Sequence, residues 1–139
     1  MDPQSSGSMN KKRISSNRIT NLAPNEIFVF GSNLQGAHGG GAARFAYERF
    51  GAVWGQGVGL FGQSYAIPTM QGGVETIKPY VDDFLQFAIV PSEFDFLVTE
   101  IGCGIAGFTP KEIAPLFFKA IKNDFSNVYL PESFYMGYE

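Results

Sequence analysis

The chain contains very little cysteine and histidine, and its charges nearly balance. One cysteine in 139 residues cannot form an internal disulfide or a cysteine zinc cluster, and it fits a reducing compartment. Ten lysines and arginines against 13 aspartates and glutamates argue against a surface for duplex nucleic acid. With a single histidine beside the single cysteine, no metal-ligand spacing exists, so we predict neither a metal site nor a cofactor.

Long hydrophobic runs are missing as well. No apolar stretch approaches the roughly 20 residues that span a bilayer, and no charged segment followed by an apolar run marks export. We therefore expect a cytoplasmic protein with no membrane partner. Residues 1–8, MDPQSSGS, have the composition of an expression scar; we treat 9–24 as an N-terminal segment and 25–139 as one domain.

Glycine and phenylalanine are abundant, with 17 and 14 residues. Residues 27–30, IFVF, form an apolar run typical of a buried strand, and Ala42, Ala46 and Phe50 then recur on one helical face. The glycines between them are Gly36, Gly39, Gly40 and Gly41. Glycines at a helix start leave backbone N–H groups accessible, and such groups bind phosphate. This segment therefore predicts a nucleotide-binding loop.

Further strands are predicted along the chain. Residues 64–68, SYAIP, form a short strand that ends at its proline, and 94–101 form a second buried strand. Residues 128–130 supply a final strand. The segment 51–63 is too rich in glycine for a long regular element, so we interpret it as a loop that could contain an edge strand.

Two more helices are predicted between these strands. The first has Pro79 in its first turn and carries its apolar residues on one face: Ile77, Val81, Phe84, Leu85 and Ala88. The second begins at 109–112, TPKE, which is a capping-box sequence, and its apolar face continues to Ile121. Alternating strands and helices predict a three-layer α/β/α domain around a mostly parallel, mixed sheet. Ligands of such sheets bind at the carboxyl ends of the strands, where both glycine loops lie.

The two glycine loops occur in a recognisable order. VFGSNLQGAHGGGAA follows the first strand and IGCGIAGFTP follows the second buried strand. This pattern resembles the macro domain family over about 26–130. The resemblance implies a macro-like fold that binds ADP-ribose or a related NAD-derived nucleotide, free or attached to a modified target. IGCG followed by an apolar residue is similar to the branch that removes ADP-ribose from acidic side chains.

The resemblance also implies the residues of the site. It gives Glu26 the recognition of adenine and Asn33 a place near the distal ribose, although Glu26 could be a solvated strand start and Asn33 a turn stabiliser. The first phosphate loop is 39–41 and the second is 104–108. The complete expected set is Glu26, Gly31, Ser32, Asn33, His38, Gly39, Gly40, Gly41, Gly102, Cys103, Gly104, Ile105, Ala106, Gly107 and Phe108.

The chain departs from the family where catalysis is concerned. The branch with IGCG carries a lysine after a strand similar to SYAIPT, and an aspartate after the IGCG unit. Here these places hold Thr69 or Met70, and Ala106. Many hydrolytic members also have an asparagine where this chain has Phe30. We therefore expect binding without lysine-dependent hydrolysis.

Two residues are alternative catalytic candidates. Cys103 lies between two glycines on a strand-to-helix turn, which can expose a thiol and lower its pKa, although it could also be a packing residue. His38 could relay a proton, or it could be an ordinary loop residue. The alternatives to binding are thus hydrolysis of an ADP-ribosyl compound with His38 or a substrate-held water, and a Cys103-dependent hydrolase or transferase.

Overall fold

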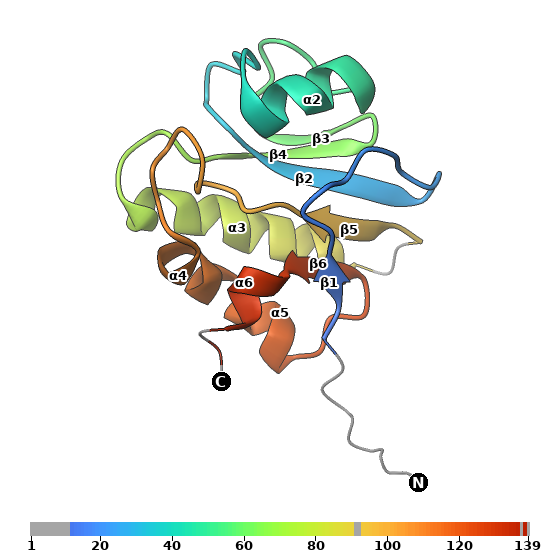
Figure 1. Cartoon of the computed structure of the whole chain (residues 1–139), viewed down its shortest axis with the longest axis vertical. Coiled ribbons are helices and arrows are strands. Elements are labelled where there is room, and N and C mark those ends of the chain that lie inside the picture. Colours follow the sequence, from blue (N-terminus) through green and yellow to red (C-terminus); the bar gives the residue numbers. More distant parts are fainter. Residues whose placement is uncertain (1–11, 91–92, 137, 139) are drawn as a thin grey trace, which may run out of the picture.

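The computed structural model describes residues 12–90, 93–136 and 138, which leaves the predicted scar at 1–8 outside the described residues. The fold is α/β, built on a six-stranded sheet in the order β1-β6-β5-β2-β4-β3 (Figure 1). Neighbouring strands are parallel except that β3 runs antiparallel to β4, so the prediction of a mostly parallel, mixed sheet is confirmed. The strands are β1 (Ile14–Ser15), β2 (Glu26–Ser32), β3 (Gly59–Phe61), β4 (Ser64–Pro68), β5 (Asp95–Val98) and β6 (Val128–Pro131).

Two helix predictions need correction. The helices are α2 (Gly41–Arg49), α3 (Val74–Ile89), α4 (Pro110–Ile113), the 3-10 helix η1 (Ala114–Phe117), α5 (Phe118–Lys122) and α6 (Glu132–Tyr135). The single helix expected after the capping box is divided into α4, η1 and α5, because Pro115 has no N–H with which to continue the α-helical ladder. Pro79 lies inside α3 instead of in its first turn, since the helix already begins at Val74 after an extended Gly73.

Side chains alternate along β2 between two hydrophobic clusters. Ile27 and Val29 pack in the larger cluster with α3 and the C-terminal helices. Phe28 and Phe30 pack in the smaller cluster with α2. Successive residues of a strand point to opposite faces of a sheet, so each face is covered, and Figure 1 shows α2 and α3 on opposite sides of β2.

The strand boundaries differ from the expected ones in places. β4 spans the residues expected for it, and β3 is the edge strand that the glycine-rich segment was expected to allow. β5 ends at Val98, before the expected boundary, so that Thr99 and Glu100 follow the strand. β1, in the N-terminal segment, was not predicted.

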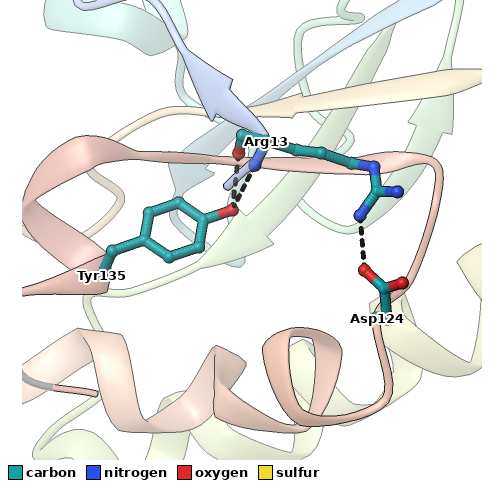
Figure 2. Close-up of polar contacts among 3 residues, drawn as sticks. All are labelled: Arg13, Asp124 and Tyr135. Carbon is teal, nitrogen blue, oxygen red and sulfur yellow. Dashed lines mark hydrogen bonds and ion pairs between the residues drawn. The ribbon is translucent and has the colours of Figure 1, made fainter. Parts of the chain in front are cut away.

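Contacts with the C-terminal part of the chain hold the short strand β1 (Figure 2). The Tyr135 hydroxyl accepts a hydrogen bond from the Arg13 backbone N–H at 3.1 Å and donates one to the Arg13 carbonyl at 2.6 Å. The Arg13 guanidinium also pairs with Asp124 at 2.7 Å. These contacts hold the residue directly before β1, a strand that is only two residues long.

In the described part of the chain, no helix is both long and apolar enough to cross a bilayer.

Candidate functional site

The two glycine-rich loops border one cleft of about 380 Å³. The cleft lies where β2, β4 and β5 end, with Ser32, Thr69 and Thr99 in its wall. Its volume falls in the range of small-molecule sites. The expected site residues that line it are Gly31, Ser32, Asn33, Gly40, Gly41, Gly102, Cys103, Gly104, Ile105 and Ala106.

Both loops contribute backbone N–H groups that have no acceptor. The helix α2 begins at Gly41 and has no side-chain cap, so the N–H groups of its first turn have no partner inside the helix. In the second loop, the N–H groups of Gly104, Ile105 and Ala106 donate to no acceptor within the described residues. Such donors, on two sides of one cleft, are suited to an anion.

The backbone at the floor of the cleft is tightly packed. A Cβ on Gly31 would lie 3.3 Å from both the Gly102 nitrogen and the Thr69 Oγ1 atom. Gly102 has a φ of +75°, in the left-handed region that favours glycine. The second loop keeps its shape through the Phe108 N–H, which donates to the Gly102 carbonyl at 2.8 Å. Glycine is therefore favoured at Gly31 by tight packing and at Gly102 by its backbone conformation.

Asn33 lines the cleft but uses its amide within the first loop. Its Oδ1 accepts a hydrogen bond from the Ala37 N–H at 2.8 Å, and its Nδ2 donates to the Ala37 carbonyl at 3.0 Å. The alternative role of Asn33 as a turn stabiliser is thus present in the structure.

His38 is fully buried and is not among the residues that line the cleft. Its Nε2 atom lies 3.0 Å from the Val53 carbonyl and 3.2 Å from the Gln56 carbonyl. These contacts attach the first glycine loop to 53–56. The geometry therefore does not support His38 as a proton relay in the cleft; it supports a loop-holding role.

Cys103 lines the cleft, but its environment does not activate the thiol. Burial, followed by the carboxylates of Glu100 and Glu112, raises the pKa of Cys103 to about 11. Of the two alternatives for Cys103, a lowered pKa is thus contradicted and packing is supported, because burial disfavours the thiolate and the two carboxylates disfavour it further.

We expect Cys103 to react with iodoacetamide at pH 7.5 at least about tenfold more slowly than a free cysteine thiol. A thiol with a raised pKa holds little of the reactive thiolate at that pH, which outweighs the greater nucleophilicity of the thiolate. The rate should increase steeply between pH 8 and pH 10, and unfolding in denaturant should restore ordinary reactivity. Because the chain has one cysteine, mass spectrometry can follow the reaction directly. Reaction at the free-thiol rate in the folded protein would contradict this environment.

Glu26 lies away from the cleft, at the amino end of β2. Its Oε1 accepts a hydrogen bond from the Ala23 N–H at 2.8 Å. Glu26 and Ser32 are the two ends of the seven-residue strand β2, so six residue steps separate them, which corresponds to about 20 Å along a strand. The structure therefore does not bring Glu26 together with the glycine loops, and Gly39, Gly107 and Phe108 also fall outside the cleft lining.

A second cavity of about 440 Å³ adjoins the cleft. Its wall includes residues 16–20, which follow β1, together with Phe28 and Phe45. Gly41, Ala42, Thr99 and Glu100 line both spaces. Neither this cavity nor the place of Glu100 was predicted from the sequence. The available signal was the position of Glu100 directly after a buried strand that leads into a glycine loop.

Fold and site together define an α/β protein with a cleft between two glycine-rich loops at the carboxyl edge of its sheet. No family model matches the chain, and neither the curated proteins nor the solved structures give a significant match.

Proposed function

We propose that the protein binds ADP-ribose or a related NAD-derived nucleotide, with the diphosphate between the two glycine loops. The observation that carries this proposal is the set of N–H donors without acceptors that the two loops contribute to one cleft. Among the described residues that line the cleft there is no lysine or arginine. A diphosphate would therefore be held by backbone N–H groups and by the dipole of α2.

The second cavity supports a ligand larger than a diphosphate. It shares four residues with the cleft, so one ligand can extend from one space into the other. Its apolar wall of Phe28 and Phe45 suits a planar base, and Asn17 and Arg18 are polar groups beside it. We assign base recognition to this cavity in place of Glu26.

We also propose the macro-like, three-layer α/β/α arrangement that the sequence motifs imply. What supports it is the hydrophobic cluster on each face of the mostly parallel sheet, with α2 on one face and α3 on the other. The order of the two glycine loops along the chain agrees with the same arrangement.

Binding without lysine-dependent hydrolysis is the activity that we infer. Thr69, Met70 and Ala106 line the cleft, at the places where the branch with IGCG has its lysine and aspartate. Threonine, methionine and alanine supply neither an amine nucleophile nor a carboxylate base. The raised pKa of Cys103 and the burial of His38 give no support to the Cys103-dependent alternative. A protein that reads or sequesters an ADP-ribosyl group fits this cleft best.

Titration calorimetry tests the proposal with ADP-ribose, NAD, ADP, AMP and ribose 5-phosphate. We expect ADP-ribose to bind with a dissociation constant in the micromolar range or tighter, which is about −8 kcal/mol, and AMP at least tenfold more weakly because it lacks the second phosphate. Chromatography of the same mixtures, and of proteins ADP-ribosylated on glutamate, detects hydrolysis. Equal binding of AMP and ADP-ribose, or no binding of either, would contradict the proposal. Efficient turnover would favour the hydrolase alternative.

A further inference from the structure

Glu100 lies at the junction of the cleft and the second cavity, and it lines both. Apart from the Cys103 thiol, it is the one ionisable side chain among the described residues that line the glycine cleft. A carboxylate is unusual beside an anion site, because like charges repel. Its position therefore requires an explanation in terms of the ligand.

One contact from another element orients the Glu100 carboxylate, which is exposed to solvent. The Ser133 hydroxyl, on α6, donates to Oε2 of Glu100 at 2.5 Å. The other carboxylate oxygen, Oε1, accepts no hydrogen bond from the described residues. The negative charge of Glu100 also acts inside the cleft, since it is one of the causes that raise the pKa of Cys103.

The chemistry of the junction limits what can lie against this carboxylate. A phosphate against this solvent-exposed carboxylate would be repelled, and an apolar group would displace water from the open oxygen without supplying a donor. If the diphosphate lies at the glycine loops and the base in the second cavity, the group between them is the ribose of the nucleotide. Its 2′- and 3′-hydroxyls are adjacent donors, and an ionised carboxylate accepts hydrogen bonds from both.

We propose that Glu100 is a specificity-determining residue, which accepts hydrogen bonds from the 2′- and 3′-hydroxyls of the ribose between base and diphosphate. This inference rests on the proposed function. It assigns to one side chain the discrimination between ribonucleotides and deoxyribonucleotides.

The test is calorimetry of the full chain with ADP, 2′-deoxy-ADP and 3′-deoxy-ADP. We expect the wild-type protein to bind ADP about tenfold more tightly than either deoxy form, since hydrogen bonds to charged groups are the stronger ones. In Glu100→Gln the affinity for ADP should fall about tenfold, while the affinities for the deoxy forms change little. The variant thus loses most of the discrimination.

Glu112→Gln is the matched control. Glu112 also raises the pKa of Cys103, but it does not line the cleft, and glutamine can keep its place in the capping box of α4. The variant removes the same charge and should leave the ratio of ADP to deoxy-ADP affinity unchanged. Thermal unfolding verifies that both variants fold.

Several results would overturn the inference. Equal wild-type affinity for ADP and both deoxy forms would do so without any variant. A Glu100→Gln variant that binds all three ligands more tightly by one common factor would show that Glu100 merely repels phosphate. If ADP-ribose binds and the ribose hydroxyls make no difference, this inference alone fails. If no nucleotide binds, the proposed function fails with it.

Discussion

Replacing Gly40 with glutamate is expected to weaken ADP-ribose binding by about 100-fold or more. Gly40 is the N-cap of α2 and lines the cleft. A carboxylate here would occupy the N–H groups that the diphosphate needs and would repel the phosphate charges. Loss of two charge-assisted hydrogen bonds, at about 1.5 kcal/mol each, corresponds to that factor. Calorimetry with ADP-ribose measures the change.

Two further variants at Gly40 separate charge from size. The φ of Gly40 is −154°, which any residue adopts, and a Cβ there would lie 3.7 Å from the Cδ1 atom of Ile105, an ordinary contact. All three variants should therefore fold. Gly40→Ala should lose less than tenfold in affinity, and Gly40→Gln should lie between alanine and glutamate. Unchanged affinity in a folded Gly40→Glu variant would place the diphosphate elsewhere.

Gly57→Ala is expected to destabilise the protein by about 3 kcal/mol, the upper part of the range for overpacking. A Cβ on Gly57 would overlap the Asn33 carbonyl oxygen, and both partners are backbone. The Ser32 hydroxyl holds the two segments together by donating to the Gly57 carbonyl at 2.5 Å. The collision is relieved only if one of these backbone segments moves, and Asn33 lines the cleft, so ADP-ribose affinity should decrease as well. Urea denaturation measures the free energy of unfolding.

Gly104→Ala is the matched control for this substitution. A Cβ on Gly104 meets nothing within 4 Å, and its φ lies outside the left-handed region. The same chemical change should therefore alter the free energy of unfolding by no more than about 0.5 kcal/mol. A Gly57→Ala variant as stable as Gly104→Ala would show that Gly57 and the Asn33 backbone are not packed in the way described.

The central elements of the fold could be predicted because their signals are local. SYAIP ends at a proline, and β4 ends at Pro68. The two glycine loops can be recognised from their composition, and in the structure both line one cleft. β1 gives no such signal, because two residues have no periodicity. Its place depends on hydrogen bonds between Arg13 and Tyr135, which are 122 positions apart.

The candidate site was harder to predict where the role of a residue depends on its burial or on the order of strands in the sheet. Glu26 was assigned to the ligand through the family resemblance, yet its side chain bonds to the Ala23 N–H at the amino end of β2. The sequence gives no signal that His38 is buried against 53–56. It also gives no signal that Glu100 and residues 16–20 line one cavity. The meeting of Glu100 with residues 16–20 follows from the order of strands in the sheet, in which β1, β6 and β5 are neighbours.

The hydroxyl of Tyr135 has a consequence for distant parts of the molecule. It holds Arg13, directly before β1, and residues 16–20, directly after β1, form one wall of the second cavity. The same helix, α6, carries Ser133, which orients Glu100. α6 therefore acts as a shared support of the base and ribose parts of the proposed site. It also packs against α4, which follows the second phosphate loop, so a disturbance of this C-terminal helix would change both the nucleoside preference and the affinity for diphosphate.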